Sequence, residues 1–275
     1  MTARRRGGRV AADVVLLAVA LLFLIPLAWV VLAAFDARAD YRAKIPEQFT
    51  LENFSSILTP ELTLLPLANS LLLSFGAGAL TVIVSVLAAY PLSRYRSRVN
   101  GPFLYGILFA SCLPITAIMV PVYSLFVRLQ LIDKPWAVVL FLATSSLPMC
   151  IWMTKNFMDS VPVSLEEAGW VDGASRMVAL QRIVVPLMRP GIAVVFVFSF
   201  LQAWGNFFVP FVLLTSSEWQ PAAVSIYSFF GQYGAIAYGR LAAFSILYSL
   251  PVLMLYVLVT RVFGGGFAMS GAVKG

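Results

Sequence analysis

Residues 68–92 read ANSLLLSFGAGALTVIVSVLAAYPL and contain no charged side chain. This stretch lies inside an uncharged run that extends over residues 62–93. A helix needs about 20 apolar residues to cross a hydrocarbon layer of about 30 Å, and this run is longer than that. We therefore predict a membrane-spanning helix here and an integral membrane protein overall.

Five other uncharged stretches also have the length of a membrane span. After trimming at prolines and polar ends, the six predicted spans cover residues 12–35, 68–92, 103–127, 136–157, 190–214 and 241–262. A seventh uncharged stretch, 219–239, contains several Gly, Gln and Ser residues, which make a poor lipid-facing helix, and we interpret it as a loop or re-entrant segment. The sequence thus predicts an all-α protein with six transmembrane helices in a single domain over residues 1–275.

The composition of the chain points the same way. Its 275 residues are 61% hydrophobic and 11% charged, with a mean hydropathy of +0.91, which leaves too little polar surface for a soluble globule. The sequence has no histidine, and its two cysteines, Cys112 and Cys150, lie in apolar stretches. A His or Cys metal site, a histidine general base and a disulfide framework therefore lack their residues, and we predict a non-catalytic protein without a metal site.

The positive charges predict the orientation of the chain. With six spans, 13 Lys and Arg residues fall on the side of both termini and 6 fall on the other side. Cationic loops are retained in the cytoplasm during insertion, so both termini are predicted to be cytoplasmic. The net charge of +7 thus reflects topology, and we predict a lipid bilayer and no nucleic acid as a partner.

Residues 158–189 form a predicted cytoplasmic loop that reads as two short helices rather than coil. Ser164 is the predicted N-cap of the first helix, with Glu167 completing a capping box, and Gly173 is its predicted stop. A second helix is predicted over residues 175–185, before a proline ends it. The small residues and carboxylates suit contact with another protein, but an amphipathic hairpin on lipid headgroups is an alternative that the residues leave open.

Three short motifs in this loop form a signature. They are Glu167-Ala168-Gly169, Asp172-Gly173-Ala174, and Ile183-Val184-Val185-Pro186 followed by Pro190. Together they resemble the cytoplasmic signature of binding-protein-dependent ABC transporter permeases, in which a Glu-Ala-Ala triplet precedes a Gly and an Ile-x-Leu-Pro element. Gly169 and Val185 depart from that pattern, and Gly169 lowers the helix propensity by about 1 kcal/mol while keeping the surface small.

Other stretches narrow the resemblance to the sugar-type permeases, of which the G subunit of the maltose transporter is an example. These stretches are residues 204–210 in the fifth span, Asn69-Ser70, residues 88–94 and the terminal residues 271–275. Gly205 and Asn206 stand where the family usually has Asn and an acidic residue, so the role of that carboxylate in relatives does not carry over to this chain.

The resemblance implies the fold of a type I ABC importer permease, multi-pass in the bacterial plasma membrane. It implies that the loop 158–189 couples to a cytoplasmic ABC ATPase present in two copies. This chain has no P-loop motif, so ATP and Mg are expected to bind to that ATPase. The residues implicated are Ser164, Glu166, Glu167, Ala168, Gly169, Asp172, Gly173, Ala174 and Pro186, with Glu167 as the expected salt-bridging residue. A second permease subunit, forming a heterodimer, and an extracytoplasmic solute-binding protein are the other implied partners.

The implied function is the import of a sugar or sugar-like solute. Asn69, Trp204 and Asn206 are the candidates for the substrate path, because an aromatic ring beside amides suits sugar recognition. The candidates for contact with the binding protein are Gln220, Gln232 and Tyr233.

An ion-coupled secondary transporter of a small polar solute is the alternative function. Proton coupling is disfavoured because none of the six uncharged stretches contains Asp, Glu or His. Sodium coupling through backbone carbonyl groups stays open.

Overall fold

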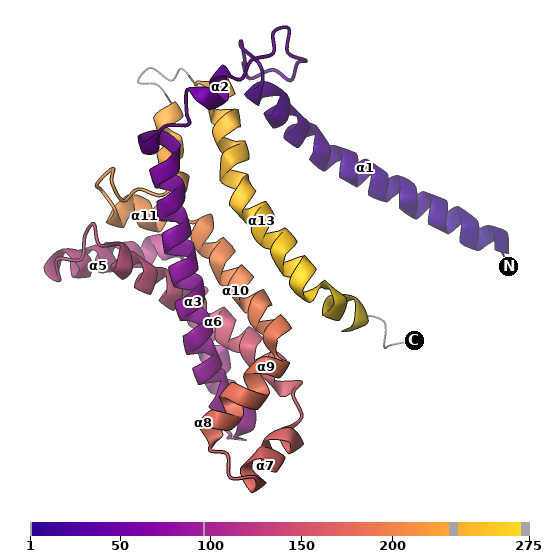
Figure 1. Cartoon of the computed structure of the whole chain (residues 1–275), viewed down its shortest axis with the longest axis vertical. Coiled ribbons are helices and arrows are strands. Elements are labelled where there is room, and N and C mark those ends of the chain that lie inside the picture. Colours follow the sequence, from indigo (N-terminus) through magenta and orange to yellow (C-terminus); the bar gives the residue numbers. More distant parts are fainter. Residues whose placement is uncertain (1, 96, 231–235, 271–275) are drawn as a thin grey trace. The chain divides into compact units, whose positions relative to one another are not determined.

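The computed structural model describes residues 2–95, 97–230 and 236–270. Within those ranges the chain is helical and forms no β-strand beyond isolated bridges, which confirms the predicted all-α class (Figure 1). The longer helices are α1 (Thr2–Ala34), α3 (Leu65–Arg94), α4 (Asn100–Ala110), α5 (Ile115–Arg128), α6 (Pro135–Asp159), α10 (Arg189–Trp204) and α13 (Tyr238–Ser270). The shorter ones are α2 (Glu52–Ser55), η1 (Pro60–Leu64), α7 (Val163–Val171), α8 (Arg176–Ala179), η2 (Leu180–Val184), α9 (Val185–Leu187), α11 (Phe208–Leu213), α12 (Ala222–Ser225) and η3 (Ile226–Phe229).

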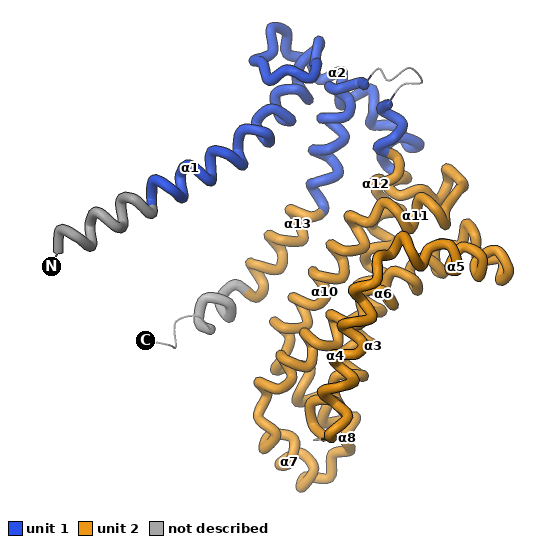
Figure 2. Tube along the Cα trace, turned by 180° about the vertical axis from the view of Figure 1, so that it is seen from behind, with its two compact units in different colours: residues 1–64, 226–251 blue, residues 65–225, 252–275 orange. Residues whose placement is uncertain are grey.

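The chain divides into two compact units (Figure 2). The first comprises Met1–Leu64 with Ile226–Pro251, and the second comprises Leu65–Ser225 with Val252–Gly275. In the first unit, the side-chain amide of Asn53 donates hydrogen bonds to the carbonyl oxygens of Ala34 (3.1 Å) and Asp36 (2.9 Å), which fixes the end of α1. The loop 158–189 and the predicted substrate-path residues lie in the second unit.

Four unbroken helices in the described part of the chain are long and apolar enough to cross a membrane. They are Asp13–Ala34, Pro60–Arg94, Pro135–Asp159 and Tyr238–Phe263. The predicted third span corresponds to two helices, α4 and α5, which are bent by 86° and form either a broken span or a re-entrant loop. The predicted fifth span is interrupted between α10 and α11.

Proline and glycine explain both interruptions. Pro114 is extended, with φ −64° and ψ 130°, and a proline disfavours the helical conformation of the residue before it, so α4 does not continue into α5. In the fifth span, α10 ends at Trp204, and Gly205, a poor helix former, follows as its C-cap. Interrupted helices are tolerated within membranes where the break is buried in protein or lines a cavity.

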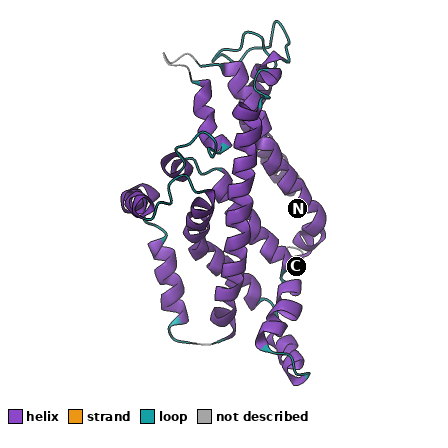
Figure 3. Ribbon diagram, turned by 60° about the vertical axis from the view of Figure 1, so that its left-hand side comes forward, coloured by secondary structure: helices purple, strands orange, loops and turns teal. Residues whose placement is uncertain are grey.

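The helices α3, α6 and α10 pack together in the second unit (Figure 2). Figure 3 shows the described part of the chain as helices joined by loops. Small residues bring them close, because a Cβ atom on Gly78 would lie 2.9 Å from Cε2 of Phe196. Hydroxyl groups also join them: Ser199 donates to Thr81 Oγ1 (3.1 Å), which donates to the carbonyl oxygen of Ala143 (3.3 Å). Close packing and interhelical hydrogen bonds are the interactions that hold helices together in lipid.

Residues 158–189 fold into short helices as predicted, but the first helix begins differently. Pro162 is the N-cap of α7, with no capping hydrogen bond from a side chain, so the capping box predicted for Ser164 and Glu167 is wrong. The helix begins at Val163, one residue before Ser164, directly after Pro162, whose φ is −60° and ψ 130°. Gly173 has φ +87° and ends the helix as predicted.

The second helix of this loop also runs further than predicted. Ser175 caps α8 by accepting a hydrogen bond from the Val178 N–H group (3.4 Å). A π-helical turn, η2, then leads into α9, whose first turn contains Pro186, so the prediction that Pro186 ends the helix is wrong. A proline in a first turn lacks only an N–H group that would be unpaired anyway. The chain turns at Met188, where the stretches Arg176–Leu187 and Arg189–Trp204 are bent by 82°.

Candidate functional site

Two adjacent glutamates on α7 have opposite environments. Glu166 has no exposed surface, whereas Glu167 is exposed. Consecutive residues of an α-helix point about 100° apart, so a helix that lies on other helices turns one of the two inward and the other outward. The helix α7 therefore holds one buried acid and presents one exposed acid.

Two side chains from the end of α3 hold Glu166. The Tyr90 hydroxyl donates a hydrogen bond to Glu166 Oε2 at 2.8 Å, and Arg94 Nε donates to Oε1 at 2.5 Å. The side chain of Arg94 is only 5% exposed, so both members of this ion pair are buried. A buried carboxylate is stable when it is paired and hydrogen-bonded, and Glu166 meets both conditions. We call Tyr90, Arg94 and Glu166 the buried clamp.

Arg94 also connects the ends of α3 and α6. Its Nη2 donates to the carbonyl oxygen of Val161 (3.2 Å), and its Nη1 donates to Ser93 Oγ (3.0 Å). Ser93 in turn donates to Asp159 Oδ1 (2.6 Å), and Lys155 forms an ion pair with the same carboxylate. The clamp therefore joins α7 to the ends of two helices at once.

The other side of α7 is exposed in this chain. The exposed residues are Ser164, Leu165, Glu167, Ala168, Trp170, Val171, Asp172 and Gly173, which we call the outer face of α7. Three of them are large and apolar, and Val171 is 88% exposed. Clustered apolar side chains beside carboxylates and small residues are typical of a surface that another protein covers.

The remaining residues predicted for this site lie at the joint between α7 and the helices after it. Gly169, Ala174 and Pro186 are half-buried. A Cβ atom on Gly169 would lie 2.7 Å from Cδ1 of Ile183, so the glycine lets α7 approach η2 closely. This contact gives a physical reason for the glycine in the triplet.

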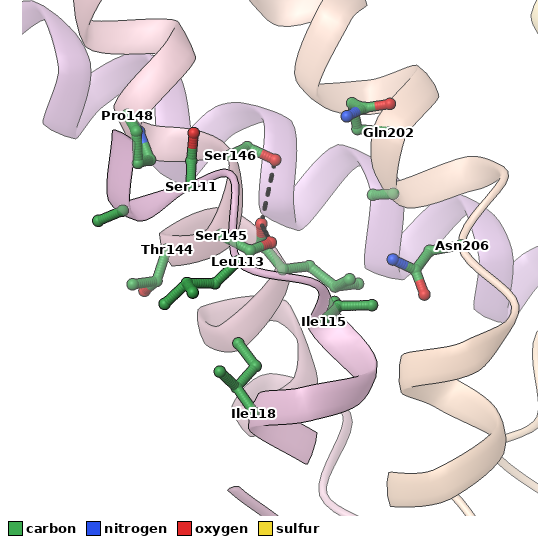
Figure 4. A pocket seen from close by; sticks show the side chains of 13 residues that line it. Ser111, Leu113, Ile115, Ile118, Thr144, Ser145, Ser146, Pro148, Gln202 and Asn206 are labelled. Atoms are coloured by element: carbon green, nitrogen blue, oxygen red, sulfur yellow. Dashed lines mark hydrogen bonds between the residues drawn. The ribbon is translucent and has the colours of Figure 1, made fainter. Parts of the chain in front are cut away.

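A cavity of about 350 Å³ lies at the break between α4 and α5 (Figure 4). Its polar lining residues are Ser111, Thr144, Ser145, Ser146, Gln202 and Asn206. Asn206 was singled out by the sequence, and its Oδ1 also accepts a hydrogen bond from Val209 N–H (3.0 Å), which caps α11. The sequence interpretation missed Gln202 and the hydroxyls of α6, although Thr-Ser-Ser within an apolar span was a visible signal.

The other two substrate-path candidates lie away from this cavity. Trp204 is buried and stacks on Phe200, with ring centroids 5.5 Å apart and planes at 16°. Asn69 donates from Nδ2 to the carbonyl oxygens of Glu218 (2.8 Å) and Gln220 (3.2 Å). Both side chains thus contact other residues of the chain, and their place in the substrate path stays a prediction.

Gln220 is half-buried, and its carbonyl oxygen is the group that Asn69 holds. Gln232 and Tyr233, the other two candidates for contact with a binding protein, lie outside the described residues.

Asp133 fixes the segment that follows α11. Its carboxylate accepts hydrogen bonds from Ser216 N–H (2.8 Å) and from the Thr215 hydroxyl (2.7 Å). Burial alone would raise the pKa of this carboxyl, but these hydrogen bonds outweigh burial and hold its pKa below 3.8.

Within the described ranges, no group of three His, Cys, Asp or Glu side chains lies close enough together to hold a metal ion.

Comparisons with known proteins agree with this architecture. Residues 81–265 match the family described as binding-protein-dependent transport system inner membrane component. The chain is 30% identical to the inner membrane ABC transporter permease protein YcjP of Escherichia coli K12, over 88% of this chain and 86% of that protein. It is 28% identical to the sulfoquinovosyl glycerol transport system permease protein SmoH of Agrobacterium fabrum, over 92% and 89%.

A solved structure has the same fold. A chain of a bacterial ABC transporter involved in the import of the acidic polysaccharide alginate matches with a TM-score of 0.82 and 21% identity. The match covers 96% of this chain and 99% of that chain. The fold predicted from the sequence is therefore shown over nearly the whole length.

Proposed function

We propose, since this chain belongs to the family of binding-protein-dependent transport system inner membrane components, that it is the permease subunit of an ATP-driven importer for a sugar or sugar-like solute. Two relatives in the comparison support this substrate class, because one is named for a sulfoquinovosyl glycerol and the other for alginate. The observation that carries the coupling role is the outer face of α7, which is exposed while the helix itself is anchored by the buried clamp.

The outer face of α7 is the proposed docking surface for a cytoplasmic ABC ATPase, of which two copies bind ATP and Mg. Glu167 and Asp172 are exposed carboxylates that suit a cationic groove, and Ala168 and Gly173 let a partner backbone approach closely. Hydrolysis takes place on that partner, and this chain transmits the resulting movement. Glu166 is buried and therefore contributes by holding α7 rather than by touching the ATPase.

The cavity at the break between α4 and α5 is the proposed part of the solute path in this chain. Its polar side chains are hydroxyls and amides, and none of its lining residues is charged. Such groups donate and accept hydrogen bonds with sugar hydroxyls without requiring a charged solute. A second permease subunit, as a heterodimer partner, completes the path.

The proposed location is the bacterial plasma membrane, with several spans in the bilayer and both termini in the cytoplasm, as the distribution of Lys and Arg indicates. An extracytoplasmic solute-binding protein delivers the solute from the other side. The segment around Gln220 is the proposed part of this chain that it meets.

Reconstitution tests this proposal directly. The chain is coexpressed with its partner permease and ATPase, and uptake of a panel of radiolabelled sugars is followed in proteoliposomes with the binding protein added. We expect uptake that requires ATP inside the vesicles and that survives collapse of the proton and sodium gradients. Uptake that ignores ATP and stops when an ion gradient collapses would support the secondary transporter instead.

A further inference from the structure

We propose that the buried clamp is the joint through which α7 moves α3, and that Glu166 is a positioning residue with a role separate from that of Glu167. This inference rests on the proposed function, because it concerns how movement of a docked α7 reaches the membrane helices.

The clamp joins segments that the chain connects only indirectly. Glu166 lies 72 residues after Arg94 and 76 residues after Tyr90, so its bonds to α3 are tertiary contacts. Along the chain, α7 follows α6 through three residues and leads to α8 through four. Without the clamp, the polypeptide would link α7 to the ends of α6 and α8 but not to α3.

Burial makes this joint stiff. The carboxylate of Glu166 is 0% exposed and the side chain of Arg94 is 5% exposed, so neither charge can separate without leaving the other unpaired in a poorly solvated site. Arg94 Nη2 also donates a hydrogen bond to Val161 and Nη1 donates one to Ser93, so the guanidinium group is fixed at several points. An exposed ion pair would exchange with water, whereas this one opens only at a large cost.

An apolar cluster beneath the clamp favours the same rigid arrangement. Its buried members are Val86, Ala89 and Tyr90 of α3, Met158 and Val161 at the end of α6, and Leu180, Val184 and Met188 from the helices after α7. The cluster thus packs α3 against the segments on either side of α7, while the clamp adds a directional bond from α7 itself. A push on α7 would therefore displace α3 with it.

The test uses the complete transporter in proteoliposomes and measures the number of solute molecules imported per ATP hydrolysed. Glu166→Gln keeps the shape of the side chain and removes its charge, and we expect the ratio to fall about fivefold or more while the complex stays assembled. Arg94→Lys keeps a charge opposite Glu166 but loses the guanidinium bonds to Val161 and Ser93, and we expect a ratio between those of the parent protein and Glu166→Gln. Glu47→Gln, the same substitution at an exposed glutamate of the first unit, is the matched control and should leave the ratio unchanged.

Spin labels supply a readout that loss of folding would not imitate. One label replaces Val163 at the start of α7 and the other replaces Ile83, an exposed residue of α3, after both native cysteines are removed. We expect the distance between the labels to be the same without nucleotide and with bound ATP in the parent protein, and to change with ATP in Glu166→Gln.

Two outcomes would overturn the inference. One is a distance that already changes with ATP in the parent protein, and the other is an unchanged coupling ratio in Glu166→Gln. A crosslink from α7 to the ATPase separates these results from failure of the proposed function. If the crosslink forms but the distance between α7 and α3 changes with ATP in the parent protein, only the proposed role of the clamp is wrong. If the crosslink never forms, the proposed docking of α7 on the ATPase is wrong.

Discussion

The Tyr90 hydroxyl donates a hydrogen bond of 2.8 Å to Glu166 Oε2, although 76 residues separate the two in the sequence. This bond satisfies one oxygen of a fully buried carboxylate whose other oxygen is paired with Arg94. A charged group at this depth needs both partners, so each bond has a measurable effect on stability.

Tyr90→Phe removes this hydrogen bond and leaves the ion pair intact. We expect the free energy of unfolding to fall by about 1–3 kcal/mol, because Glu166 Oε2 loses a donor in a site that water does not reach. Thermal unfolding of the detergent-solubilised protein measures the change. Tyr105→Phe is the control, since Tyr105 is 74% exposed and should show little change. Equal losses in the two variants would mean that the hydrogen bond to Glu166 does not contribute measurably to the free energy of unfolding.

Gly191→Ala tests the close contact between α10 and α6. A Cβ atom at position 191 would overlap Cγ of Phe157, so the ring or the helix must move. We expect a loss of about 1–3 kcal/mol in the free energy of unfolding. Gly106→Ala is the matched control, because it is also helical and its Cβ would meet nothing within 4 Å. That variant should be neutral or slightly stabilising, since alanine has the higher helix propensity.

Glu167→Lys reverses the charge on the outer face of α7. We expect uptake to fall about tenfold or more, together with the hydrolysis stimulated by the binding protein, because the introduced lysine repels the cationic groove that Glu167 is proposed to contact. The complex should still copurify, since the side chain is exposed and holds no part of the fold. If uptake and stimulated hydrolysis both survive, Glu167 has no coupling role.

The hydrogen bonds that Asp133 accepts from Thr215 and Ser216 are expected to weaken in acid. Its pKa is lowered in the folded protein by hydrogen bonds from Ser216 and Thr215, so the carboxylate stabilises the fold at pH values above about 3.8. This stabilisation is lost as the pH falls from 3.8 through the lower folded-state pKa. Unfolding temperatures measured from pH 6 down to about pH 3 should therefore drop less steeply in Asp133→Asn than in the parent protein. Asparagine tolerates the positive φ of 59° at this position, so backbone strain does not confuse the comparison. Parallel curves would show that Asp133 contributes nothing to this dependence.

Much of the fold could be predicted because the membrane imposes local constraints. An uncharged run of sufficient length must be helical in lipid, so the positions of α3 and α6 followed from the sequence. Gly173 could be identified as a helix stop because its positive φ suits glycine. The interruption of the third span was less predictable, because a proline in a span can kink a helix mildly or break it, and the neighbouring helices decide between the two.

The sequence could not predict that Glu166 is buried while Glu167 is exposed. Adjacent acids at the start of a helix suit its positive end equally well, and only the packing of α7 determines which one is turned inward. Arg94 appeared among the cations of a connecting loop, and nothing in the local sequence indicates that it pairs with Glu166. The run Thr144-Ser145-Ser146 indicated a polar face of α6, but Ser145 and Gln202 come together with Asn206 only through the packing of α10 and α6, so the cavity itself could not be predicted.

Site-specific crosslinking shows whether the outer face of α7 meets the ATPase subunit. A photoreactive amino acid replaces Val171 on the outer face of α7, and a second preparation carries it at Tyr41, an exposed residue of the first unit. Both are illuminated in the assembled transporter, and the products are identified by mass spectrometry. We predict that position 171 crosslinks to the ATPase subunit and that position 41 does not. An assembled, transport-active complex in which position 171 never reaches the ATPase would contradict the account.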